Sequence, residues 1–334
     1  MSFTAIARFV LWPFSMLYGS IVRFRAWLFE VGVLKAERLK KPVISIGNLT
    51  LGGTGKTPMV IWLAEKLLAE GKRVGILSRG YRGDGRTSDE IELMKCRLKN
   101  RAQFCVGKDR VVQGQRLQDS VDIFLLDDGY QHLRLARNVN ILLMDAVRPL
   151  AGERLLPAGR LREPVSAMHR ADILVITRAD SVPQTESAIA KLDEYPVFAA
   201  RTKLVGFRKM WADETAPILS PTELGEGPFF VFCGIGNPGA FLLDLQKWNL
   251  PVSGREAFAD HHHYSDGEIH ELLDAAREVG SKALITTEKD AQNMADVDAV
   301  EVPIYVAVIE IDFPQEDAFL DAIRQRIPAR QAAQ

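Results

Sequence analysis

The stretch from Val43 to Val60, VISIGNLTLGGTGKTPMV, constrains the fold of this chain more than any other part of the sequence. An apolar, β-branched run gives way to a loop rich in glycine, and an amphipathic helix is expected from about Pro58 to Glu70. Glycines allow the loop to turn its backbone N–H groups inward, and the N-terminus of the following helix adds partial positive charge at the same place. This order of elements indicates a phosphate-binding P-loop.

The residues expected to bind nucleotide phosphates are Gly52, Gly53, Thr54, Gly55, Lys56 and Thr57. Lys56 is predicted to reach the β- and γ-phosphates, and the hydroxyl of Thr57 is predicted to bind Mg²⁺. The motif G-x-x-x-x-G-K-[ST] fails at its first position, where this chain has Thr50. An ordinary glycine-rich turn between a strand and a helix is the alternative interpretation.

A second motif ends the buried strand that is predicted from Asp122 to Asp127 (DIFLLD). The strand runs into Asp127 and Asp128 as a Walker B element does, because a carboxylate that serves Mg²⁺ lies at the carboxyl edge of a parallel sheet. Alone this pattern is weak, since many strands of α/β proteins end in aspartate. Together with the P-loop it predicts that Asp127 and Asp128 bind magnesium.

Strands that alternate with helices predict an α/β fold with a mostly parallel sheet and right-handed βαβ connections. The 334 residues allow about two domains of ordinary size. The expected order is an N-terminal region at 1–42, a P-loop domain at 43–204, a linker at 205–227, a smaller α/β domain at 228–328 and a disordered tail at 329–334.

Net charge and cysteine content exclude several classes of protein. The formal net charge of −1 argues against a general nucleic-acid binder. The three cysteines, Cys96, Cys105 and Cys233, lie far apart and form no C-x-x-C pair, so neither a disulfide framework nor a zinc site is expected.

The first 42 residues form a separate region in which basic residues outnumber acidic ones. From Phe9 to Val22 there is no charge, but fourteen helical residues reach only about 21 Å, short of the roughly 30 Å hydrocarbon core of a bilayer. We expect an amphipathic helix in the membrane interface, with the basic residues from Arg23 to Lys41 facing anionic headgroups. The alternatives are a secretory signal peptide, for which no clear cleavage site follows, and a helix pair packed on the protein body.

Three adjacent histidines, His261, His262 and His263, lie in the smaller domain. Adjacent side chains on a strand point to opposite faces, so all three converge on a metal only if a special loop brings them together. A general base or a substrate-binding role for one of them is the more economical interpretation. A surface histidine cluster is the alternative.

Two loops contain further charged residues that are candidates for the functional site. Ser88-Asp89-Glu90 lies in a loop after a predicted strand, and neighbouring carboxylates in loops are usually solvated. The segment PAGRLREP at 157–164 is bounded by prolines, and its Arg160, Arg162 and Glu163 face either phosphates or water.

Seven segments together resemble the motifs of the tetraacyldisaccharide 4′-kinase family, the lipid A kinases of Gram-negative envelopes. They are IGNLTLGGTGKTP at 46–58, LSRGY at 77–81, LDDGYQH at 126–132, PAGRLREP at 157–164, FCGIGNP at 232–238, FADHHHY at 258–264 and TTEKDA at 286–291. The segments follow the family order and span nearly the whole chain. The family also lacks the first Walker glycine, and an N-terminal membrane segment is one of its traits.

The resemblance implies transfer of the γ-phosphoryl of ATP to the 4′-hydroxyl of tetraacyldisaccharide 1-phosphate, a lipid, to give lipid IVA. It implies two α/β/α domains, with ATP and Mg²⁺ as cofactors. It also implies action at the cytoplasmic face of the bacterial inner membrane, where the N-terminal helix contacts the membrane surface. No obligate protein partner is inferred.

The resemblance also assigns roles to single residues. The family's catalytic aspartate falls on Asp89, its histidine falls on His261, and Glu163 becomes a further candidate for binding magnesium. Lys56 keeps its role at the phosphates. The resulting hypothesis is that Asp89 and His261 take the proton from the 4′-hydroxyl, and that domain closure brings these two residues together from different domains.

Two other functions are compatible with parts of the sequence. A membrane-attached nucleotide switch of the partitioning-ATPase kind joins an amphipathic anchor to a G-G-x-G-K-T loop, but it carries a lysine where this chain has Leu51. The other is a kinase of a soluble small molecule whose N-terminal helix merely packs on the fold.

Overall fold

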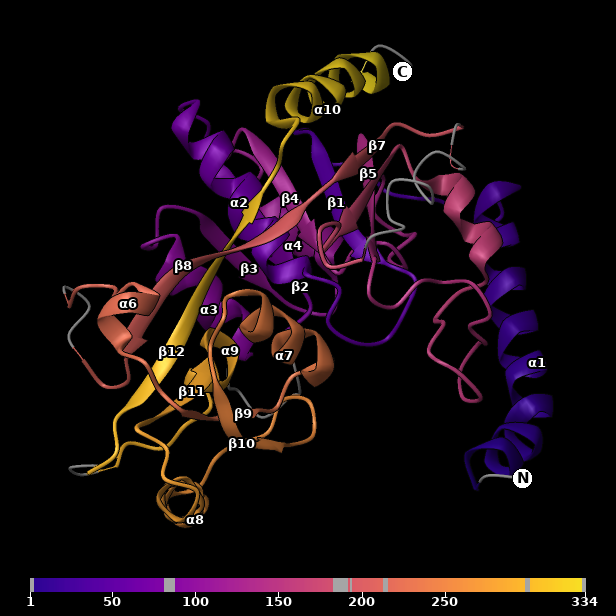
Figure 1. The fold of residues 1–334 in the computed structure, drawn as a ribbon. Coiled ribbons are helices and arrows are strands. Elements are labelled where there is room, and N and C mark those ends of the chain that lie inside the picture. The colour runs from indigo at the N-terminus through magenta and orange to yellow at the C-terminus, as the bar shows by residue number, and fades with distance from the viewer. Residues whose placement is uncertain are drawn as a thin grey trace. The chain divides into compact units, whose positions relative to one another are not determined.

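The computed structural model describes residues 3–80, 88–182, 192, 194–212, 216–297 and 301–331. The chain forms two compact units. The larger unit comprises Met1–Arg86, Lys95–Arg201 and Phe313–Gln334, and the smaller unit comprises Thr87–Met94 and Thr202–Asp312. Each unit is built on its own sheet (Figure 1).

The larger unit contains a seven-stranded parallel sheet with the strand order β3-β2-β4-β1-β5-β6-β7. Its strands are β1 (Val43–Asn48), β2 (Val74–Ser78), β3 (Gln103–Val106), β4 (Ile123–Asp127), β5 (Val139–Asp145), β6 (Ile173–Thr177) and β7 (Val197–Ala199). The helical segments are α1 (Phe3–Glu30), α2 (Lys56–Ala69), α4 (Arg110–Leu117), the 3-10 helix η1 (Val165–Arg170) and α10 (Glu316–Gln331). Helix α3 (Asp89–Arg97) begins in the smaller unit and ends in the larger one.

The inner strands of this sheet are buried on both faces. Every residue of β1, β2, β4 and β6 is buried, which explains the continuous apolar runs in the sequence. Helix α2 packs on β1, β2 and β4, and α4 packs on β2 and β3. The predicted α/β fold with a mostly parallel sheet is confirmed.

Helix α10, which the sequence did not predict, packs on α2. The ring of Trp62 in α2 lies 4.5 Å from the ring of Phe313 and 5.8 Å from that of Phe319, measured between centroids. Both phenylalanines are buried. Because α10 runs to Gln331, residues 329–331 are helical and do not belong to the expected disordered tail, whose remaining residues 332–334 lie outside the described ones.

Gly47 lets the segment after β4 approach β1. A Cβ atom at position 47 would lie 2.7 Å from both the backbone nitrogen and the Cβ atom of Tyr130. The Tyr130 side chain is fully buried, and its hydroxyl donates a hydrogen bond to the carbonyl of Ala167 at 2.7 Å. This contact fixes the segment that follows Asp127 and Asp128 against β1.

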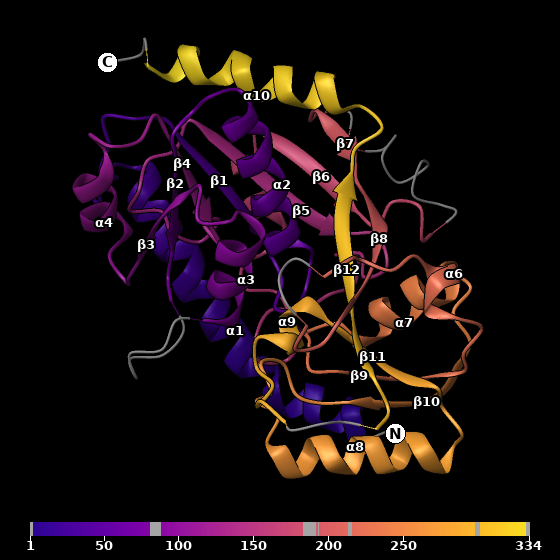
Figure 2. The same cartoon turned by 90° about the vertical axis from the view of Figure 1, so that its left-hand side faces the viewer.

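Helix α1 is 28 residues long and runs along one side of the larger unit (Figure 1, Figure 2). Ser15 and Tyr18 attach it to the segment at 155–162. The Ser15 hydroxyl donates a hydrogen bond to the carbonyl of Leu155 and accepts one from the N–H of Ala158, both at 2.9 Å. The Tyr18 hydroxyl donates to the carbonyl of Arg162 at 2.8 Å.

Many of the apolar side chains that the structure describes in α1 are exposed. Those at least half exposed are Val10, Trp12, Phe14, Met16, Leu17, Ile21, Phe24 and Trp27. The polar side chains of α1 that bind the protein are therefore separate from its exposed apolar residues. Among the helices that the structure describes, none combines the length and apolar character that crossing a bilayer requires.

The smaller unit contains a five-stranded sheet with the strand order β10-β9-β11-β12-β8, of which β9 to β12 are parallel. Its strands are β8 (Arg201–Lys209), β9 (Phe229–Cys233), β10 (Val252–Ala257), β11 (Ala283–Thr287) and β12 (Ile304–Asp312). Its helices are α6 (Pro221–Leu224), α7 (Pro238–Lys247), α8 (Asp266–Glu278) and α9 (Glu288–Ala291). Alternate residues of β9 pack on α7 and on α8, so these two helices cover opposite faces.

Residues 205–209, expected to begin a linker, form the end of β8. Phe207 is fully buried there, whereas most of the strand is exposed or half-buried. The strand lies at the edge of the sheet, and edge strands keep charged side chains such as those of Arg208 and Lys209. For that reason the sequence showed no apolar run at this point.

The Gly47→Ala variant should destabilise the larger unit by about 1–3 kcal/mol, because an added methyl group overlaps backbone atoms of Tyr130 that have no room to move. Gly267→Ala in α8 is the control, since nothing lies within 4 Å of a Cβ atom there. Differential scanning calorimetry of the full chain measures both variants. Equal stabilities for the two would contradict the close contact at Gly47.

Candidate functional site

The glycine loop after β1 contains two glycines in the left-handed region. Gly52 and Gly55 have φ angles of 103° and 81°, which residues with a Cβ atom rarely adopt. Gly55 is also the N-cap of α2, so the loop leads directly into a helix N-terminus. Such a terminus favours anions, because its first N–H groups lack partners within the helix.

The end of β6 holds this loop in place. Thr177 Oγ1 donates a hydrogen bond to the carbonyl of Thr54 at 3.1 Å, and Arg178 donates one to the carbonyl of Gly53 at 2.9 Å. Arg178 is in turn paired with Asp145 at the end of β5, with Nε 3.0 Å from Oδ1. The loop conformation therefore depends on side chains from two neighbouring strands as well as on its glycines.

Lys56 lies among polar groups from the ends of β1 and β4. Its Nζ atom is 3.2 Å from Oδ1 of Asn48 and 3.5 Å from Oδ1 of Asp128. Asp128 also accepts hydrogen bonds of 2.7 and 2.9 Å from Arg162. The structure thus brings Lys56 and Asp128 together, and it adds Arg162 from the proline-bounded loop.

Asp127 and Asp128 follow β4, which pairs in parallel with β1. Asp127 accepts a hydrogen bond of 3.1 Å from Ser78 at the end of β2. Burial raises the pKa of Asp128, but the charges of Lys56 and Arg162 lower it by a larger amount. The pKa of Asp128 therefore lies below the ordinary value. Asp128 is therefore ionised at neutral pH.

Glu163, expected to be a further magnesium carboxylate, is almost fully buried and engaged within the protein. It forms an ion pair with Arg170, and Gln131 Nε2 lies 3.4 Å from the same carboxylate oxygen. Gln131 also donates a hydrogen bond to the carbonyl of Asn48 at 2.8 Å. Glu163 is thus connected to the end of β1 through Gln131, while its charge is balanced by Arg170.

Asp89 and His261 form a hydrogen-bonded pair within the smaller unit. The two carboxylate oxygens of Asp89 lie 3.0 and 2.9 Å from Nδ1 of His261. Asn293 donates a further hydrogen bond to the carboxylate at 3.2 Å, and the N–H of Glu90 donates one at 2.9 Å. Asp89 is only 8% exposed, so this carboxylate is held almost entirely by protein groups.

The pair corrects two sequence-based expectations. Asp89 was placed in a loop, but it is the first residue of α3, where the helix dipole favours the charges of Asp89, Glu90 and Glu92. Asp89 and His261 were also expected in different domains and in need of closure. Residues Thr87–Met94 belong to the smaller unit, so the pair is complete within that unit.

His261 lies at the carboxyl end of the smaller sheet. Its N–H donates a hydrogen bond of 3.0 Å to the carbonyl of Gly234, directly after β9, and its φ angle is 62°. In the sheet, β10 lies on one side of β9 and the next strand along the chain, β11, lies on the other side of β9. Such a reversal of strand order at the carboxyl edge is where α/β sheets bind ligands.

The pair shifts the pKa values of both side chains. Burial raises the pKa of Asp89, but the hydrogen bond from His261 and the charge of Lys289 lower it by a larger amount. The pKa of Asp89 therefore lies below the ordinary value. The hydrogen bond to Asp89 raises the pKa of His261 above its ordinary value, against the effect of burial. An ionised carboxylate bound to Nδ1 leaves Nε2 as the nitrogen that takes up a proton.

The other two histidines do not join His261. His262 pairs with Glu268, with Nε2 3.0 Å from Oε1, and His263 is exposed. Across the described ranges of the chain, no group of three or more His, Cys, Asp or Glu side chains is arranged to hold a metal ion. A role for one histidine as a base fits this arrangement better than a three-histidine metal site.

Sequence reasoning assigned no role to several residues that hold these groups. Arg178 and Thr177 support the glycine loop, and Asn293 and Lys289 contact Asp89. Lys289 lies in the segment TTEKDA, which was noted only as a resemblance. No periodicity or spacing joins these residues to their partners, because the contacts arise from the folding of distant strands.

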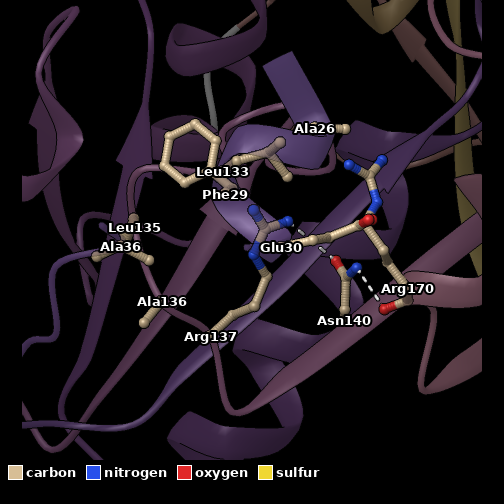
Figure 3. Close-up of a pocket in the computed structure, with 10 residues that line it drawn as sticks. All are labelled: Ala26, Phe29, Glu30, Ala36, Leu133, Leu135, Ala136, Arg137, Asn140 and Arg170. Atoms are coloured by element: carbon tan, nitrogen blue, oxygen red, sulfur yellow. Dashed lines mark hydrogen bonds between the residues drawn. The ribbon is translucent and has the colours of Figure 1, made fainter. Parts of the chain in front are cut away.

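A pocket of about 300 Å³ lies beside α1, and one of its lining residues is Arg170, the ion-pair partner of Glu163 (Figure 3). It is lined by Phe29 of α1, Leu133, Arg137, Asn140 and Arg170, among others. Arg137 donates hydrogen bonds to three backbone carbonyls, and Asn140 donates one to the carbonyl of Arg170. None of the site residues predicted from the sequence lines this pocket.

The comparisons with known proteins agree with one another. The model of the family "Tetraacyldisaccharide-1-P 4′-kinase" matches residues 7–328. Proteins named tetraacyldisaccharide 4′-kinase from Geobacter sulfurreducens and Geobacter metallireducens are 39% and 38% identical, covering 93% and 89% of this chain and 91% of each relative. The crystal structure of LpxK from Aquifex aeolicus in complex with ATP matches with a TM-score of 0.74 and 30% identity, covering 96% of this chain and 99% of that one.

The Asp89→Asn variant should lower the pKa of His261 by about one pH unit or more, because an amide removes the charge that stabilises the imidazolium. NMR titration of the full chain with labelled histidines measures the pKa of His261. The His261 signal is assigned as the one that is absent from a His261→Gln variant. Asp266→Asn, which removes the partner of His270, is the control. An unchanged His261 titration in Asp89→Asn would show that the pair does not exist in solution.

Proposed function

Because the chain belongs to the tetraacyldisaccharide-1-phosphate 4′-kinase family, we propose that it transfers the γ-phosphoryl of ATP to the 4′-hydroxyl of tetraacyldisaccharide 1-phosphate, giving lipid IVA. The observation that carries this proposal is the pair of Asp89 and His261 in a chain that also has a P-loop. A nucleotide switch needs no base for an acceptor hydroxyl, so the pair favours a kinase.

The larger unit supplies the groups that bind the nucleotide. The glycine loop and the N-terminus of α2 offer N–H groups to the phosphates, and Lys56 balances negative charge on the γ-phosphoryl group as it is transferred. Thr57, Asp127 and Asp128 offer hard oxygen ligands of the kind Mg²⁺ prefers, and the low pKa of Asp128 keeps that carboxylate ionised. Mg²⁺ bound by these residues would neutralise phosphate charge. Glu163 is a further candidate carboxylate ligand.

The smaller unit supplies the base. Nε2 of His261 takes the proton of the 4′-hydroxyl as the hydroxyl oxygen attacks the γ-phosphorus, the bond from that phosphorus to the β–γ bridging oxygen breaks and ADP leaves. Asp89 holds the Nδ1–H group and stabilises the imidazolium that forms. Phosphoryl transfer needs mostly positioning and charge neutralisation, so a base of this kind orients the nucleophile as much as it activates it.

The exposed apolar side of α1 supports contact between the enzyme and the membrane that holds its lipid substrate. Leu17, Ile21 and Phe24 are each about 60% exposed, while Ser15 and Tyr18 bind the protein. Exposed apolar side chains on one helix, near a strongly basic segment, fit insertion into the headgroup region of an anionic membrane. The protein thus acts as a peripheral enzyme, at the cytoplasmic face of the bacterial inner membrane where ATP is available.

Purified wild-type protein in detergent micelles should transfer label from γ-labelled ATP to tetraacyldisaccharide 1-phosphate. Lys56→Ala and Asp89→Ala should each lower the rate at least about a hundredfold, since one loses phosphate charge balance and the other loses the support of the base. Thin-layer chromatography and mass spectrometry of the lipid measure the product. A folded wild type that binds ATP and yields no phosphorylated lipid would overturn the kinase proposal.

The Leu17→Glu, Ile21→Glu double variant should lower binding to anionic vesicles by about tenfold or more. Placing carboxylates in the interface costs well over the 1.4 kcal/mol that corresponds to a tenfold change. Leu243→Glu, Val279→Glu is the matched control, because Leu243 is exposed on α7 and Val279 is exposed directly after α8, both in the smaller unit. Co-sedimentation measures binding, and equal binding by both double variants would exclude α1 as the membrane contact.

A further inference from the structure

Lys289 lies next to the Asp89–His261 pair and has no role in the mechanism so far. It is in the one-turn helix α9, directly after β11. Its Nζ atom lies 2.9 Å from Oδ1 of Asp260, 3.8 Å from Oδ2 of Asp89 and 3.7 Å from Oε1 of Glu90. The same atom is 3.5 Å from Nε2 of His261, the nitrogen that would receive the proton.

The backbone around Lys289 is tied to the loop that carries His261. The neighbouring Asp290 is almost fully buried and accepts hydrogen bonds from the N–H of Gly234 at 2.6 Å and from the hydroxyl of Tyr264 at 2.9 Å. His261 in turn donates its N–H to the carbonyl of Gly234. The backbone segments that carry Lys289 and His261 are therefore connected by one set of hydrogen bonds.

We propose that Lys289 is a positioning residue for His261. Its ammonium group disfavours a proton on Nε2, so that this nitrogen stays unprotonated and able to accept the proton of the hydroxyl group. The same ammonium group binds the carboxylates around the imidazole. This inference rests on the proposed function, in which His261 is the base. An ammonium group 3.5 Å from a ring nitrogen repels a second positive charge there, and it can donate a hydrogen bond to the unprotonated nitrogen. The imidazole is then held as the tautomer with its hydrogen on Nδ1, facing Asp89.

The charges that surround His261 explain why such a cation is needed. Asp89 accepts from Nδ1, Glu90 lies on the same first turn of α3, and Asp260 lies 3.9 Å from Nε2. Asp89 and Asp260 raise the pKa of His261, whereas burial and Lys289 lower it. Without Lys289 the imidazole would stay protonated to higher pH, so less of it would be free to accept the hydroxyl proton at a given pH.

Lys289 itself remains charged in this setting. Burial lowers its pKa, but Glu90, Asp89 and Asp260 raise it by more, so the pKa lies above its ordinary value. Among the described residues, two further titratable groups beside the His261 loop have partners of their own. His262 pairs with Glu268 of α8, and Asp290 faces Gly234 and Tyr264.

The test compares Lys289→Met, Lys289→Arg and Lys282→Met in the full chain. Lys282 is exposed at the start of β11, so its replacement changes the net charge by the same amount away from the pair. In Lys289→Met, the acid limb of the plot of kcat against pH should move to higher pH by about one unit. The midpoint of the NMR titration of His261 should move by the same amount. Lys289→Arg should restore the position of the limb, Lys282→Met should match wild type, and KM for ATP should be unchanged throughout.

A second variant tests the sign of the effect and covers the case in which Lys289→Met fails to fold. Asp260→Asn removes a negative charge near Nε2, so the His261 titration and the acid limb should move to lower pH. A uniform fall of kcat with no movement along the pH axis in either variant would make Lys289 merely structural and overturn the inference.

Failure of the proposed function gives a different result. In that case wild type produces no phosphorylated lipid, or His261→Ala turns over as fast as wild type. The NMR titration still reports whether Lys289 controls the pKa of His261, so the two failures are distinguishable.

Discussion

The parallel pairing of β1 with β4 is the constraint on which the larger unit depends. It places the start of the glycine loop beside the end of the strand that carries Asp127 and Asp128, about eighty residues later in the chain. Gly47 allows the segment after these aspartates to pack against β1, and Tyr130 anchors that segment to the carbonyl of Ala167. Lys56 and Asp128 are brought together as a consequence of sheet pairing.

Several carboxylates in both units are each paired with a cation. Asp128 binds Lys56 and Arg162, Asp145 binds Arg178, and Glu163 binds Arg170. In the smaller unit, Asp89 binds His261 near Lys289. Removing one partner of such a pair leaves an uncompensated buried charge, which costs several kcal/mol, so the site residues also stabilise the fold.

The sequence predicted the elements whose residues repeat a local pattern. The glycine loop, the strand that ends in Asp127 and the α/β order have signatures that depend only on neighbouring residues. The family resemblance, now confirmed, supplied Asp89 and His261, which no periodicity links. The sequence alone did not show that Asp89 belongs with the smaller unit, because its helix begins where the chain passes between units. Supporting contacts such as those of Arg178 and Lys289 depend on three-dimensional register and were missed.

In the proposed mechanism the two units have different roles: the larger unit binds ATP and the smaller unit supplies the base. Calorimetric titration of ATP into wild type, His261→Ala and Lys56→Ala, together with turnover of each, tests this division most directly. We expect His261→Ala to bind ATP like wild type while its turnover falls at least about a hundredfold. We expect Lys56→Ala to bind ATP much more weakly than wild type. A parallel loss of ATP affinity and turnover in His261→Ala would exclude this division of roles, because it would make His261 part of nucleotide binding or of the fold.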